Sequence, residues 1–183
     1  QGELQDRERR ATRQRTAIAH LALEDSIVRG DMARALKKIT GVLSATVSAS
    51  RTSIWKLSED GHALNCISLY ESGEHMASRD PVVNMREFPR YFETIMAESR
   101  IHAEEAQTDP RSSELTDYFK EHGIVSILDA GIIVDGRLAG VVSLEQAGRR
   151  AQWHADEESF VSTIAAIVGQ LFANVERKKA EDA

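Results

Sequence analysis

Residues 122–153 read HGIVSILDAGIIVDGRLAGVVSLEQAGRRAQW, and this stretch decides the fold. Two apolar runs, Ile124–Val134 and Leu138–Leu144, flank the dipeptide Asp135-Gly136. Asp-Gly supplies the positive φ angles of a tight two-residue turn, so the pattern predicts an antiparallel β-hairpin. Neither run alternates cleanly between apolar and polar residues, which indicates strands in the middle of a sheet. We expect helices over one face of this sheet and a partly polar cavity over the other.

On either side of the hairpin, helical and strand patterns alternate with turn residues. A charged helical pattern over Glu3–Val28 ends near Gly30, which suits a left-handed cap, and Asp31 suits the N-cap of the next helix. Apolar residues at spacings of three and four predict a last helix after Trp153. The other predicted elements are a helix over Met32–Val47, strands over Arg51–Leu57 and Ala63–Tyr70, an irregular polar loop over Glu71–Pro89, a helix over Arg90–Glu98, a strand over Arg100–His102 and a helix over Ser113–Glu121. Together they predict an α/β protein of the α+β kind, with a central antiparallel sheet.

Composition argues against several classes of protein. The 183 residues carry a formal net charge of −6, whereas a dedicated nucleic-acid binder needs clustered Lys and Arg to neutralise phosphates. The longest apolar run is far shorter than the roughly 20 residues of a membrane span, and we recognise no signal peptide. The single cysteine, Cys66, cannot form an internal disulfide, which favours a reducing compartment. We therefore expect a cytoplasmic protein.

The order and spacing of these pieces resemble a GAF domain, the small-molecule-sensing α/β module of bacterial signalling proteins. The resemblance runs from about Asp31 to Val175. It is carried by Arg51–Leu57 with Asp60-Gly61, by Pro89–Ile95, Thr108–Arg111, Gly123–Ala130 and Gly136–Glu145, and by Trp153 with Asp156–Phe160. It implies that the terminal helices pack on one face of the sheet, while short helices and loops cover a ligand pocket on the other.

The same resemblance implies a division of the chain and a larger parent protein. Residues 1–30 would be an N-terminal signalling helix, 31–175 the GAF-like sensory domain, and 176–183 the start of a C-terminal linker helix. The parent would be a sensor histidine kinase of a two-component system, or a GGDEF-type cyclase. Because the chain starts with Gln1 and ends within a helical pattern, we expect a fragment of such a protein.

Candidate ligand-binding residues are the polar and aromatic side chains expected around the cavity. Such cavities are mostly apolar, with a few polar groups. The candidates are Tyr70, Phe88, Tyr91, His102, Tyr118, Phe119, Asp129, Ser143 and Glu145. The alternative is that the rings fill the core completely. A cavity too small for anything but water would then favour a ligand-free dimerisation or spacer domain.

Neither the cyclic-nucleotide signature nor the bilin attachment of GAF domains can be placed on this sequence, so the cofactor is unknown. The dispersed Asn-Lys-Phe-Asp-Glu set of the cyclic-nucleotide-binding members is not found. Bilin-binding members attach the pigment to a Cys usually followed by His, whereas Cys66 precedes Ile67 in an apolar strand and is expected to be buried and inert. The six histidines form no His-x-x-x-His pair, so no metal site is expected.

Catalytic motifs are equally lacking, and we expect no enzymatic role for this chain. The sequence contains no Gly-x-Ser-x-Gly, no phosphate-binding glycine loop and no His-Glu-x-x-His. Asp129 and Glu145 would suit an acid/base pair, but a structural role is the simpler interpretation. An enzyme of the methionine-sulfoxide-reductase type needs reactive cysteines, which Cys66 does not provide. A PAS-type sensor is a further alternative, disfavoured because two helices precede the first hairpin.

The terminal helices predict a second role, in dimerisation. A helix whose apolar stripe continues past its domain favours a partner helix. We expect a parallel homodimer in which these helices form a bundle, continuing into a flanking output module. The predicted seam is Leu21, Val28, Ile164, Ile167, Leu171 and Val175. A ligand in the cavity would then shift the hairpin against the last helix and alter the bundle.

Overall fold

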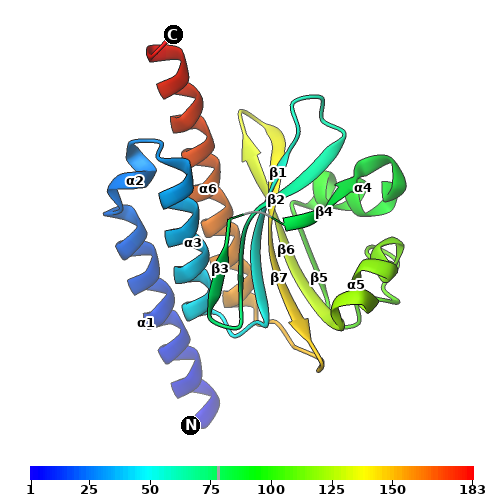
Figure 1. Ribbon diagram of the computed structural model, residues 1–183. Coiled ribbons are helices and arrows are strands. Elements are labelled where there is room, and N and C mark those ends of the chain that lie inside the picture. The colour runs from blue at the N-terminus through cyan, green and yellow to red at the C-terminus, as the bar shows by residue number, and fades with distance from the viewer. Residues whose placement is uncertain (78) are drawn as a thin grey trace.

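In the computed structural model, which describes residues 1–77 and 79–183, an antiparallel sheet separates a layer of long helices from a layer of short ones (Figure 1). Within the described residues the sheet has seven strands, in the order β3-β2-β1-β7-β6-β5, and β4 also pairs with β2. The strands are β1 (Arg51–Leu57), β2 (Ala63–Glu71), β3 (Glu74–Met76), β4 (Arg79–Asn84), β5 (Arg100–Ala103), β6 (Ile124–Val134) and β7 (Arg137–Ala147). The helices are α1 (Gly2–Ala22), α2 (Asp25–Val28), α3 (Met32–Thr46), α4 (Pro89–Glu98), α5 (Thr116–His122) and α6 (Ala155–Glu181). Short 3₁₀ turns, η1 (Met85–Glu87) and η2 (Ser113–Leu115), precede α4 and α5.

The predicted hairpin is confirmed as the central pair β6–β7. Asp135 and Gly136 form its turn with φ angles of 52° and 76°, the backbone that Asp-Gly favours. Gly30 adopts the left-handed conformation expected of a cap, with φ 67°, and the Asp31 side chain accepts a hydrogen bond from the Arg34 N–H at the start of α3. These features depend only on neighbouring residues, which is why the sequence predicts them.

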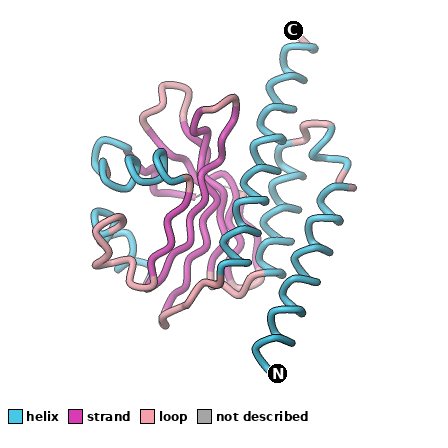
Figure 2. The backbone as a smooth tube through the Cα atoms, turned by 180° about the vertical axis from the view of Figure 1, so that it is seen from behind, coloured by secondary structure: helices cyan, strands magenta, loops and turns pink. Residues whose placement is uncertain are grey.

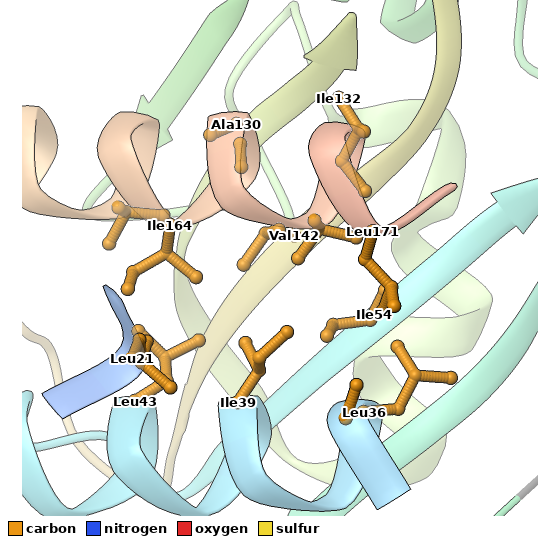
Figure 3. Packing of buried hydrophobic residues seen from close by; sticks show 14 of the residues in the cluster. Leu21, Leu36, Ile39, Leu43, Ile54, Ala130, Ile132, Val142, Ile164 and Leu171 are labelled. Carbon is orange, nitrogen blue, oxygen red and sulfur yellow. The ribbon is translucent and has the colours of Figure 1, made fainter. Parts of the chain in front are cut away.

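The long helices α1, α3 and α6 lie together on one side of the sheet (Figure 2). Figure 3 shows their core, in which Leu36, Ile39 and Leu43 of α3 meet Ile164 and Leu171 of α6 above the apolar side chains of the sheet. The sheet contributes Ile54, Ala130, Ile132 and Val142, each 1% exposed or less. Burying one such side chain stabilises a domain by about 1.5–3 kcal/mol, so this layer supplies much of the stability.

The predicted dimer seam is wrong in its residues. Leu21, Ile164, Leu171 and Val175 are at most 8% exposed and fill the core of their own chain. Ile167 is half-buried against the same core. Of the predicted seam only Val28, 61% exposed, is open to a partner. An apolar stripe at helical spacing packs on the sheet here, because the sheet offers a larger apolar surface than a neighbouring helix would.

Two local predictions are also corrected. The single helix over Glu3–Val28 is broken into α1 and α2, which lie at an angle (Figure 1). The region Glu71–Pro89, predicted as an irregular loop, contains β3, β4 and η1. Both strands pair with the outer edge of β2. Edge strands are short and tolerate proline, such as Pro81 in β4, so their sequence signal is weak.

Helix α1 is held against the domain at both ends of its buried face. Ala17 and Leu21 enter the core, and the Arg10 guanidinium donates to the Asp156 carboxylate at 3.1 and 3.2 Å. Helix α6 is long and apolar enough to cross a membrane by length and composition alone, but 56% of that stretch is buried inside the domain. Its apolar residues are therefore those of a core helix packed on β6.

Candidate ligand-binding site

A small cavity lies on the sheet face opposite the long helices, beneath α4 and α5. Its volume is about 40 Å³, which is room for water or for a group of a few atoms. Its walls are mostly apolar, with a few polar groups. The lining residues are Trp55, Leu64, Val83, Tyr91, Leu115, Tyr118, Phe119, Ile127, Asp129, Val141, Ser143 and Glu145.

Strand alternation brings the polar lining residues to this face. Ser143 and Glu145 lie two apart on β7 and therefore point to the same side, while Val142 and Leu144 point to the helical core. Asp129 on β6 is the register partner of Ser143. The hairpin thus places the Asp129 carboxylate beside the Ser143 hydroxyl, and the Glu145 carboxylate lies two residues further along β7.

Asp129 is 5% exposed and is held by two hydroxyl groups. The Ser143 Oγ donates to its Oδ1 at 2.6 Å, and the Tyr91 phenol of α4 donates to its Oδ2 at 2.5 Å. Burial raises the pKa of Asp129 to about 7, because the charged form is poorly solvated, although both hydrogen bonds act in the opposite direction. Asp129 consequently changes charge near neutral pH. Burial and the carboxylate raise the pKa of Tyr91 well above its ordinary value, so the phenol remains a donor.

Glu145 belongs to a row of charges across three strands. Arg51 of β1 pairs in register with Glu145 of β7 on one side and Glu71 of β2 on the other. Its guanidinium donates to Glu145 Oε1 at 3.0 Å and to Glu71 Oε2 at 2.6 Å. Burial raises the pKa of Glu145, while the Arg51 charge opposes that rise. The Tyr118 phenol of α5 completes the cluster by donating to Glu145 Oε1 at 3.2 Å.

Aromatic rings form part of the remaining wall. Trp55 and Tyr118 meet edge to face at 6.3 Å between ring centroids, and Phe119 lies 5.8 Å from Tyr118. The Trp55 indole N–H donates to Ser53 Oγ at 2.9 Å, so it has a partner within β1. All three rings belong to residues that line the cavity.

Six of the nine candidates from sequence line this cavity, namely Tyr91, Tyr118, Phe119, Asp129, Ser143 and Glu145. The other three lie elsewhere. Tyr70 pairs with Thr52, whose hydroxyl donates to Thr40 of α3, so Tyr70 lies on the helical face of the sheet. Phe88 packs on the cavity-side core without lining the cavity.

The prediction that His102 lies at the cavity is also wrong. Its ring Nδ1 lies 2.5 Å from the Glu158 carboxylate at the start of α6, on the face opposite the cavity. A strand of four residues carries too few alternating positions to assign its faces from sequence. Trp55 and Arg51 were not among the candidates, although their alternation with Ile54 in β1 would have placed Trp55 on the cavity side. Their position depends on the pairing of β1 with β7.

A family model described as the GAF domain matches residues 31–172. The chain belongs to the GAF family. GAF domains are regulatory, sensory domains of signalling proteins and are not catalytic, and some bind ligands or bilins. No curated protein matches the chain.

Solved structures share this GAF fold at low identity. A GAF domain from a phosphoenolpyruvate-protein phosphotransferase of Coxiella burnetii is 17% identical, with a TM-score of 0.73 over 93% of this chain and 96% of that chain. The corresponding domain from Acinetobacter is 15% identical, with a TM-score of 0.71 over 91% and 94%. The blue-light-absorbing form of the PixJ GAF domain from Thermosynechococcus elongatus is 13% identical, with a TM-score of 0.66 over 87% and 94%. These similarities show the fold. The ligand of this GAF domain has to be inferred from the residues of its own cavity.

Proposed function

We propose that this GAF domain is the sensory input of a multidomain bacterial signalling protein and that it binds a small molecule in the cavity beside Asp129. One observation carries the proposal. Asp129 is buried among apolar residues with only hydroxyl partners, and this costs folding free energy. Strongly perturbed carboxyls in a cavity are typical of functional sites. The parent protein would be a histidine kinase or a GGDEF-type protein in the cytoplasm.

The alternative function is a ligand-free spacer, and the cavity volume favours it. A volume of about 40 Å³ is far below the roughly 300–1,000 Å³ of sites that enclose a drug-sized ligand. A spacer, however, needs no buried acid. Apolar residues of similar shape would fill the same place at no electrostatic cost, and often with a gain in stability. We therefore favour a sensor whose cavity takes a small group or widens on binding.

The hairpin offers a route from the cavity to the terminal helices. Asp129 and Ser143 line the cavity, while their neighbours Ala130 and Val142 pack against the helical layer on the other face. A ligand that displaces β6 or β7 therefore acts directly on α6. Packed layers respond by switching between discrete arrangements, and such a switch is how the signal would reach an output module. We further propose a homodimer, formed by exposed parts of the terminal helices such as Val28 rather than by the buried stripe.

A binding screen with a matched pair of variants tests the sensor against the spacer. We would screen small metabolites of positive, negative and neutral charge by protein NMR against the wild-type chain, Val141→Leu and Val82→Leu. Val141 lines the cavity, and its enlargement should abolish binding, while Val82 is 53% exposed and its variant should behave as wild type. If no compound of any class binds and Val141→Leu merely raises the melting temperature, the spacer function is correct.

A further inference from the structure

The charges around the cavity do not balance. Arg51 does not line the cavity, and its guanidinium is already held between Glu145 and Glu71 at 3.0 and 2.6 Å. Asp129 accepts only the neutral hydroxyls of Ser143 and Tyr91. Among the residues that the structure describes, no Lys, Arg or His lines the cavity. Its polar end is therefore an acceptor that lacks a positive partner.

The aromatic part of the lining suits a cation as well. Trp55, Tyr91, Tyr118 and Phe119 come from three elements, and all four line the cavity. Aromatic faces attract cations, most strongly indole, and an aromatic cage next to a carboxylate is the usual recognition mode for alkylated ammonium groups. An anion placed here would meet both Asp129 and Glu145, and its binding would require the burial of a second or third negative charge.

We propose that the cavity binds a small organic cation, with an alkylammonium head group against Asp129 and the rings of Trp55, Tyr91 and Tyr118 around it. The inference rests on the proposed sensory function, since it names the ligand class of the same site. A volume of about 40 Å³ limits the enclosed part to a head group of a few non-hydrogen atoms. A ligand with a longer tail requires α4 and α5 to move outward.

Binding of a cation couples to the protonation of Asp129. The groups that face this carboxyl are Ser143 and Glu145 from β7, Tyr91 from α4 and Tyr118 from α5, and within this set only Glu145 carries a charge. An ammonium ion favours the ionised carboxylate, so its affinity should rise between pH 6 and pH 8 as Asp129 releases its proton. A neutral ligand would show no such rise.

The experiment compares probes of the same shape and different charge. We would titrate the wild-type chain with methylammonium, tetramethylammonium, choline, the neutral choline isostere 3,3-dimethylbutan-1-ol, and acetate, following backbone amide shifts by NMR. The cations should shift the resonances of β6, β7 and α4, and choline should bind at least about tenfold more tightly than its isostere, a difference of about 1.4 kcal/mol. Asp129→Asn should remove this preference. Asp117→Asn, at an exposed position in α5, should keep it.

Each outcome decides between the proposals. Equal binding of choline and its isostere, or binding of acetate alone, overturns the cation assignment and leaves a ligand-binding function standing. The same holds if all these probes fail while the wider metabolite screen finds a ligand. If that screen also finds nothing, both proposals fail together. Should Asp129→Asn not fold, the pH dependence of choline binding to the wild type replaces it, and an affinity unchanged from pH 6 to pH 8 refutes the role of Asp129.

Discussion

Replacing Asp129 by Asn should make the stability of the folded domain less sensitive to pH. In the folded chain, burial raises the pKa of this carboxyl from 3.8 to about 7. Unfolding returns it to water, where its ordinary value applies. Between these two values the folded protein keeps a proton that the unfolded chain has released. The free energy of unfolding therefore falls as the pH rises through this window, and the loss is complete above the folded pKa.

The size of the effect follows from the two pKa values. Between pH 5 and pH 8 they predict a loss of about 2.5 kcal/mol in the free energy of unfolding. In a domain of this length, about 1 kcal/mol shifts Tm by about 2–4 °C, so the corresponding fall in Tm is about 5–10 °C. Asn is close to the protonated acid in shape and charge, and its amide oxygen can still accept the Ser143 hydroxyl. The variant should match the wild type near pH 5 and exceed it at pH 8.

Urea unfolding followed by circular dichroism at pH 5, 6, 7 and 8 measures the difference. Asp117→Asn is the matched control, because it makes the same chemical change at an exposed position in the first turn of α5. Its stability should run parallel to that of the wild type at every pH. If the curves of Asp129→Asn and the wild type are also parallel from pH 5 to pH 8, Asp129 has an ordinary pKa in the folded state, and the argument from burial is refuted.

Three further sets of substitutions test other parts of the structure by the same unfolding measurements. Arg51→Met should cost about 3–5 kcal/mol because it leaves the buried Glu145 without its partner, and adding Glu145→Met should restore most of the loss; equal costs for the single and double variants would contradict this. Gly140→Ala should destabilise the domain by about 3 kcal/mol or more, since its Cβ would collide with the backbone of β1. At Gly131 an added Cβ has one tight contact, with the movable Leu138 side chain at 3.2 Å, and otherwise ordinary contacts at 3.6 Å, so Gly131→Ala should cost less than about 1 kcal/mol. Ile164→Ala should cost about 2–5 kcal/mol independently of protein concentration, because this residue is buried within its own chain; a cost that depends on concentration would restore it to a dimer seam.

The parts of the fold that the sequence predicts correctly are those produced by the conformational preferences of neighbouring residues. The Asp135-Gly136 turn, the Gly30 cap and the bounds of β1 all follow from the conformational preferences of a few neighbouring residues. Short edge strands lack such causes. β3 and β4 are held by pairing with β2, so the polar sequence between Glu71 and Pro89 reads as a loop until the partner strand is known.

The residues proposed for the site likewise divide into those that strand alternation places correctly and those that it does not. Alternation along β7 is enough to place Ser143 and Glu145 on one face, and the register of a tight hairpin then brings Asp129 beside Ser143. His102 and Tyr70 were misplaced because their strands are short or contain a register shift. A single irregularity in a strand moves every following side chain to the opposite face.

The sequence by itself determined the family, the hairpin and the face that carries the acids, because turn chemistry and strand periodicity act between neighbouring residues. The tertiary structure alone decided that β1 lies next to β7, which places Arg51 between Glu71 and Glu145 and adds Trp55 to the cavity wall. It also decided that the apolar stripe of α6 is covered by its own sheet and that the cavity measures only about 40 Å³. These outcomes depend on how closely distant segments pack, and packing is settled by the volume and shape of all the side chains together.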